Sequence, residues 1–127
     1  MDQRSDALVE LCGKTIFRAF ERYNDNFRRI TARAVNNFER RDWRNSRKDL
    51  AERIELYDKS VQRVVVQLET DLSAEQIRDR AFWVRVRRFY GERLEHYPDG
   101  IFAMTFYNSV TRRIFDTVGF DLELEFV

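Results

Sequence analysis

The stretch Phe38-Glu39-Arg40-Arg41-Asp42-Trp43 separates two long amphipathic segments and decides the fold of this 127-residue chain. Before it, apolar residues recur at alternating spacings of four and three and form one helical stripe: Ile16, Phe20, Tyr23, Phe27, Ile30 and Ala34. After it, a second stripe, interrupted by Arg47, contains Trp43, Leu50, Ile54, Tyr57, Val61, Val64 and Leu68. Asp42 is a suitable N-cap for the second helix. The sequence therefore predicts an antiparallel hairpin of two helices, each of about 30 residues or about 45 Å.

Two further helices are predicted downstream. Ser73 and Gln76 have the spacing of a capping box and would open the third helix. Its broad apolar face, which predicts packing on two sides, contains Ile77, Ala81, Phe82, Val84, Val86, Phe89, Tyr90 and Leu94. Pro98 would end that helix, because proline cannot continue the hydrogen-bond ladder. Asp99 would then cap a fourth helix that contains Phe102, Phe106, Val110, Ile114 and Phe115.

The last residues change period. Phe120, Leu122, Leu124 and Phe126 alternate with three acids, which predicts a strand with one buried face. A single strand is not stable alone, so its partner would lie beyond Val127 and the chain would be the N-terminal piece of a longer protein. The predicted fold class is all-α: a four-helix bundle-like array with two long antiparallel helices, ending in a single β-strand.

Composition excludes several classes of protein. The formal net charge is +1, from 23 cations and 22 acids, so no strong field favours nucleic acid or an anionic membrane. The single cysteine, Cys12, cannot form an internal disulfide and fits a reducing compartment. No secretion signal and no apolar run of roughly 20 residues is present. We expect a cytoplasmic protein with no membrane partner.

The residues that carry catalysis in other proteins are scarce here. One histidine, His96, and one cysteine cannot form a structural zinc site. Thr105 and Ser109 have no histidine to activate them, and the four glycines are too scattered to form a phosphate-binding loop. We therefore predict no catalytic, cofactor-binding or metal-binding residue in this chain.

The arginine-rich third helix, beside Phe82 and Trp83, is the best candidate for nucleic-acid binding. Its cations are Arg78, Arg80, Arg85, Arg87, Arg88 and Arg93, and its acids are Glu75, Asp79, Glu92 and Glu95. Pairs at i,i+3 and i,i+4 would neutralise most of these charges, so a solvated, self-paired face is favoured. We expect no nucleic-acid partner.

The order of several blocks resembles a known family. These blocks are Thr15-Ile16, Phe38-Glu39, Asp42-Trp43, Arg53-Ile54 with Leu56-Tyr57-Asp58, Tyr97-Pro98, Thr105-Phe106 and Asn108-Ser109-Val110. Together they resemble the N-terminal region of isocitrate dehydrogenase kinase/phosphatase. The resemblance implies that residues 1–127 are the N-terminal part of a helical regulatory domain.

That family consists of bifunctional bacterial enzymes that phosphorylate and dephosphorylate isocitrate dehydrogenase, which controls the branch between the citric acid cycle and the glyoxylate bypass. The resemblance implies isocitrate dehydrogenase as a partner and an adenine nucleotide effector. ATP, magnesium and the catalytic Asp would belong to a kinase-like domain that this chain lacks, so no site residue is carried over. The alternatives are a stand-alone helical interaction module that dimerises through its terminal strand, and a small helical nucleic-acid binder.

Overall fold

A computed structural model describes residues 3–119. This part of the chain forms five helices in the order α1 Gln3–Glu39, α2 Trp43–Asp71, α3 Ala74–Ile77, α4 Arg80–Arg93 and α5 Gly100–Val118. None of these helices is long and apolar enough to span a membrane. The all-α class expected from the sequence is confirmed for the described residues.

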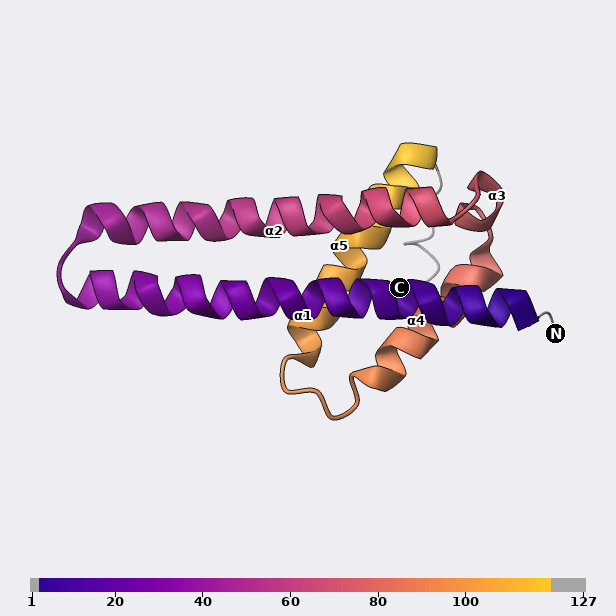
Figure 1. The fold of residues 1–127 in the computed structure, drawn as a ribbon, viewed down its shortest axis with the longest axis horizontal. Coiled ribbons are helices and arrows are strands. Elements are labelled where there is room, and N and C mark those ends of the chain that lie inside the picture. Colours follow the sequence, from indigo (N-terminus) through magenta and orange to yellow (C-terminus); the bar gives the residue numbers. More distant parts are fainter. Residues whose placement is uncertain (1–2, 120–127) are drawn as a thin grey trace.

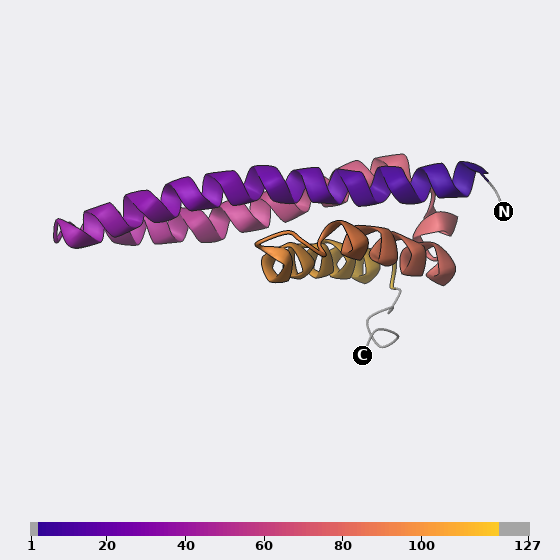
Figure 2. The same ribbon diagram turned by 90° about the horizontal axis from the view of Figure 1, so that it is seen from below.

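The helices form two layers. Helices α1 and α2 lie side by side and antiparallel as a long hairpin, and α4 and α5 form a second layer against one of its faces (Figures 1 and 2). The second layer covers only the half of the hairpin nearer the N-terminus, and the other half projects beyond it (Figure 2). We call residues 9–23 and 57–72 the covered half of the hairpin and residues 30–54 the projecting half.

The core lies between the two layers in the covered half. Its largest side chains with less than 2% exposure are Trp83, Tyr90, Tyr107, Phe20, Phe106, Ile16 and Leu68. Two large polar side chains in this core are paired: the Trp83 indole Nε1 donates to the Ile77 carbonyl at 2.7 Å, and the Tyr90 hydroxyl donates to the Ala103 carbonyl at 2.6 Å. Such pairing is required because an unpaired buried polar group costs about 1–3 kcal/mol.

Helix α1 approaches α4 closely at Gly13. A Cβ atom at this position would lie 2.5 Å from Cδ1 of Phe89, which is closer than real Cβ atoms come to other heavy atoms. The absence of a side chain at Gly13 therefore allows the Phe89 ring to pack against the backbone of α1.

The predicted helix termini are confirmed at two places. The Asp42 carboxylate accepts from the Asn45 amide at 3.2 Å and so caps α2. At the start of α3, Ser73 Oγ accepts from the Gln76 amide at 3.1 Å, while Gln76 Oε1 accepts from the Ser73 amide at 2.9 Å. These local interactions depend only on residues three apart, which explains why the sequence could predict them.

The predicted array of four helices ending in a strand is wrong. Residues 3–119 form five helices and no strand, and the segment 120–126, where the strand was expected, lies outside the described residues. The extra helix arises because the third predicted helix breaks at Arg78 and Asp79. The Asp79 carboxylate accepts from the Phe82 amide at 3.3 Å and starts α4, a new helix in a different direction.

The second apolar stripe is only partly buried. Val61, Val64 and Leu68 lie in the core, with at most 4% of their surface exposed, whereas Leu50 is 44% and Ile54 is 75% exposed. Trp43, expected on the buried stripe, is 48% exposed. The stripe is continuous in sequence, but the second layer covers only its C-terminal part.

Candidate interaction surface

The turn between α1 and α2 is held by backbone hydrogen bonds. The amides of Arg40, Arg41 and Asp42 donate to the carbonyls of Asn36, Phe38 and Asn37 at N···O distances of 3.1, 3.0 and 2.8 Å. Arg41 has φ = 61° and is the one non-glycine residue between 3 and 119 with a positive φ. This conformation costs a residue with a Cβ roughly 1–2 kcal/mol, and glycine is usual there at helix ends. An arginine therefore occupies a position where glycine would be more stable.

A buried carboxylate fixes the two helices near this turn. Asp49, whose side chain is 8% exposed, accepts from Arg33 Nε at 2.8 Å and from Asn37 Nδ2 at 2.8 Å. The second bond of the arginine goes to Glu52 at 2.5 Å. These bonds, with that to Asp49 the largest contribution, raise the pKa of Arg33 further and keep it charged. Both oxygens of the Asp49 carboxylate are thus satisfied by α1, which holds the two helices in register.

The surface of the turn combines aromatic rings with cations. Phe38 and Trp43 are 60% and 48% exposed and pack edge to face, with their ring centroids 5.0 Å apart. Around them lie five cations, Arg40, Arg41, Arg44, Arg47 and Lys48, and two acids, Glu39 and Asp42, for a net charge of +3. We call residues 38–48 the hairpin tip.

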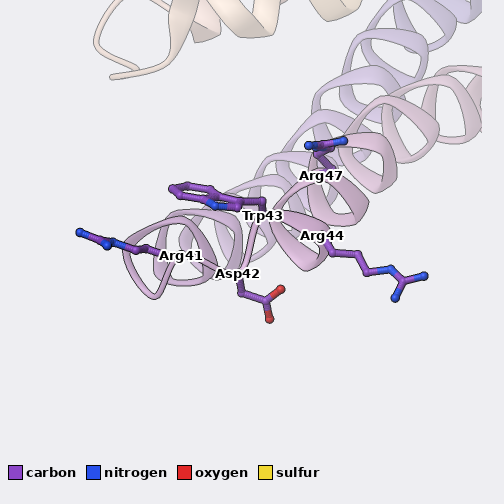
Figure 3. A pocket seen from close by; sticks show the side chains of 5 residues that line it. All are labelled: Arg41, Asp42, Trp43, Arg44 and Arg47. Carbon is purple, nitrogen blue, oxygen red and sulfur yellow. The ribbon is translucent and has the colours of Figure 1, made fainter.

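The cations of the tip do not converge on one point. Arg41, Asp42, Trp43, Arg44 and Arg47 line an open hollow of about 560 Å³. Figure 3 shows Trp43 and Arg47 on one side of the tip, whereas Arg41 and Arg44 extend in opposite directions. A small ligand needs a concave site with converging polar groups. The tip is therefore an outward-facing surface that suits a macromolecule.

An apolar strip continues from the tip along the projecting half. Ile54 lies seven residues before Val61, nearly two helical turns, and so occupies the same face of α2. Val61 is fully buried, yet Ile54 is 75% exposed and Leu50 is 44% exposed. The exposed strip is therefore a direct extension of the face that the second layer covers. The sequence pattern places Leu50 and Ile54 on one stripe with the core residue Val61, because the period alone does not show where the covering layer ends.

The polar groups between the two layers are occupied with one another. The Asp99 carboxylate accepts from Asn24 Nδ2 at 2.9 Å and also bonds Arg28, and these bonds, led by that from Asn24, lower its pKa. Asp99 was expected to cap the following helix with its side chain, and it does not. The Tyr57 hydroxyl is hydrogen-bonded to Ser109 Oγ. Both clusters join the hairpin to the second layer, which gives them a structural role.

The thiol of Cys12 is buried in the core. Burial raises the pKa of the Cys12 thiol to about 12, with a smaller contribution from Asp71, so Cys12 stays protonated. Within residues 3–119, no group of three His, Cys, Asp or Glu side chains is arranged to hold a metal ion.

Trp83, which the nucleic-acid hypothesis placed on an arginine-rich surface, is fully buried. Arginines near it reach other helices: Arg85 pairs with Asp6 of α1, and Arg78 donates to the Val118 carbonyl at 2.6 Å. The aromatic side chain that base stacking would require is therefore enclosed in the core.

The long hairpin, its partial covering layer and its outward-facing tip form a helical scaffold with exposed aromatic and cationic side chains at one end. Comparison with known sequences places this scaffold. Residues 13–127 match the family described as isocitrate dehydrogenase kinase/phosphatase (AceK), regulatory domain, and the chain belongs to that family. The resemblance inferred from the sequence is thereby confirmed.

Individual relatives agree with this assignment. The chain is 42% identical over 115 residues to the isocitrate dehydrogenase kinase/phosphatase of Xanthomonas campestris pv. campestris (strain 8004). The matched stretch covers 91% of this chain and 20% of the relative. The chain is 37% identical over 127 residues to the protein of that name from Anaeromyxobacter dehalogenans (strain 2CP-C), covering 100% of this chain and 21% of the relative. The chain thus spans about one fifth of the length of these relatives.

Proposed function

We propose that this chain is the N-terminal part of the regulatory domain of a bifunctional enzyme that phosphorylates and dephosphorylates isocitrate dehydrogenase. The observation that carries the proposal is the family match over residues 13–127, together with relatives of about 40% identity that bear this name. In this role the protein would control, in the cytoplasm, the branch between the citric acid cycle and the glyoxylate bypass. The single free thiol, Cys12, suits such a reducing compartment.

Within such an enzyme, this segment would serve as scaffold and recognition surface. ATP and magnesium would bind to a kinase-like domain elsewhere in the polypeptide, and the adenine nucleotide effector would act near the junction of the two domains. The described residues support a scaffolding role, because the Asn24–Asp99 and Tyr57–Ser109 hydrogen bonds join the hairpin to the second layer, while Phe38 and Trp43 stay exposed at the hairpin tip.

The test is a transfer assay with the full polypeptide that carries this chain. Incubated with isocitrate dehydrogenase and ATP labelled at the γ-phosphate, it should label the dehydrogenase, and it should remove the label when ATP is withdrawn. The isolated 127 residues should neither hydrolyse ATP nor change the labelled dehydrogenase. No transfer by the full polypeptide, or turnover by the isolated chain that survives a control for contaminants, would contradict the proposal.

A further inference from the structure

The cations of the hairpin tip differ from the other arginines of the hairpin. Arg33 binds Asp49 and Glu52, and Arg28 binds Asp99. By contrast, the five cations of the tip make no ion pair or hydrogen bond through their side chains with any residue of the described range 3–119. Asp42, an acid within the tip, is engaged by the amide and side chain of Asn45. The positive charge of the tip is therefore available to a partner.

The backbone conformation of Arg41 also indicates an interaction at the tip. Its left-handed conformation, φ = 61°, would be more stable with glycine. Among the described residues, the Arg41 side chain makes no hydrogen bond or ion pair that offsets this strain, and Figure 3 shows it extending outward from the turn. A strained position that carries an outward-facing charge indicates that the side chain serves an interaction.

The chemistry of the tip favours a protein partner over a nucleic acid. Exposed tryptophan and arginine are the residues most enriched at the energetic centres of protein interfaces. The net charge of +3 over residues 38–48 is modest, whereas a surface that follows a phosphate backbone is usually a strongly basic patch or stripe. The apolar strip of Leu50 and Ile54 extends the surface along α2 and suits the side chains of a protein.

The hairpin tip is better suited to a transient interface with a separate protein than to permanent burial within one polypeptide. Permanent burial would strip five cations of water, and the penalty is recovered only with well-formed pairs for each. Exposed cations instead accelerate encounter with an acidic surface and are screened by salt. The tip also lies at the end of the described molecule farthest from the second layer, where a separate protein can reach it (Figure 2).

We propose that the hairpin tip docks on an acidic surface of isocitrate dehydrogenase, with the Phe38–Trp43 pair at the centre of the contact and Arg41, Arg44 and Arg47 around it. This inference rests on the proposed function, in which that dehydrogenase is the protein substrate. The tip holds the substrate and takes no part in phosphoryl transfer. Changes at the tip therefore alter the KM for the dehydrogenase and leave turnover of bound substrate unchanged.

The test compares two double charge reversals in the full-length enzyme. Arg44→Glu with Arg47→Glu changes the tip. Arg22→Glu with Arg63→Glu makes the same change of charge on exposed residues in the groove between α1 and α2, away from the tip. The tip variant should raise the KM for isocitrate dehydrogenase at least tenfold, with kcat within twofold of wild type. The groove variant should change neither constant by more than about twofold.

Salt and a second variant sharpen the result. The KM of the wild type should rise with ionic strength, and that of the tip variant should rise less steeply. Arg41→Gly removes one charge while relieving the backbone, so it should raise the melting temperature and still raise the KM two- to threefold. That combination separates a lost contact from a damaged fold.

Three outcomes would overturn the docking proposal. The KM of the tip variant could stay within twofold of wild type. Its kcat could fall while the KM holds, which would place the tip against another part of the enzyme. The tip variant could lose binding to a fluorescent oligonucleotide while its KM is unchanged, which would indicate a nucleic-acid surface. If the wild type does not phosphorylate the dehydrogenase at all, the proposed function itself fails, and the two failures remain distinguishable.

Discussion

The covered and projecting halves of the hairpin share one sequence pattern but differ in what stabilises them. In the covered half, α2 buries Val61, Val64, Val65 and Leu68 against both α1 and the second layer. In the projecting half, α2 buries only Ser46 and Asp49, because no other helix within residues 3–119 packs against α1 and α2 there (Figure 2). The hydrogen bonds of Asp49 with Arg33 and Asn37, which we call the polar clamp, thus hold two helices in register where little apolar surface is buried. The outer faces of the two helices stay exposed there.

The largest effect should come from the core of the covered half. Trp83→Ala removes a fully buried indole that packs on Phe115 and bonds the Ile77 carbonyl. We expect the free energy of unfolding to fall by about 3–5 kcal/mol, measured by urea denaturation. A loss below about 1 kcal/mol would show that the second layer contributes little to the fold.

The clamp of the projecting half should have a smaller effect. Asp49→Ala leaves Arg33 and Asn37 without their shared acceptor and should cost about 1–3 kcal/mol, also by urea denaturation. The matched control is Glu52→Ala, which removes only an exposed ion pair and should cost less than about 1 kcal/mol. Equal losses for the two variants would mean that the buried carboxylate does not hold the helices together.

Two glycines, one in α1 and one in α4, test the close packing between the covered half and the second layer. Gly13→Ala places a methyl group against the Phe89 ring and should destabilise the protein by about 1–3 kcal/mol. Gly91→Ala, within α4, meets no atom within 4 Å and should stabilise it by about 0.5–1 kcal/mol, since alanine is the better helix former. Thermal unfolding monitored by circular dichroism distinguishes the two. A stabilising Gly13→Ala would show that α1 and α4 lie farther apart.

The smallest effect is expected at the tip, and it is a gain. Arg41→Gly relieves the left-handed backbone and should raise the free energy of unfolding by about 0.5–1 kcal/mol. Arg41→Ala, which also removes the charge but keeps a Cβ, is the control and should leave stability nearly unchanged. If alanine stabilised the chain as much as glycine, charge repulsion rather than backbone conformation would be responsible.

The features that the sequence could predict are local. The cap at Asp42 and the capping box of Ser73 and Gln76 depend on residues three positions apart, and both formed as expected. The two amphipathic stripes predicted the hairpin correctly. The break at Asp79 was missed because Asp79 lies inside a continuous helical pattern of apolar residues, which does not show that an N-cap there starts a new helix. The Trp83 indole donates to the Ile77 carbonyl on the other side of the break, and this contact depends on the three-dimensional fold.

The tip could not be found from the sequence. Trp43 and Ile54 follow the same helical period as Val61, and they are exposed because the second layer does not extend over them. The positive φ of Arg41 was not predictable either, because the residue type argues against it. The sequence does not show which arginines form ion pairs, because pairing depends on three-dimensional placement. Arg33 pairs with Asp49 and Glu52, whereas Arg47 pairs with no acid of the described range, and nothing in the sequence distinguishes the two.

The chain carries two tryptophans, Trp43 in the projecting half and Trp83 in the second layer that packs on the covered half, and they test the central claim most directly. Trp43→Phe leaves Trp83 as the single indole, and subtracting its fluorescence from that of the wild type isolates Trp43. Acrylamide should quench the Trp43 component strongly and the Trp83 component weakly, because the exposed fractions are 48% and 0%. Equal and weak quenching of both indoles would show that the tip is enclosed, and would contradict the division of the hairpin into a covered half and an exposed one.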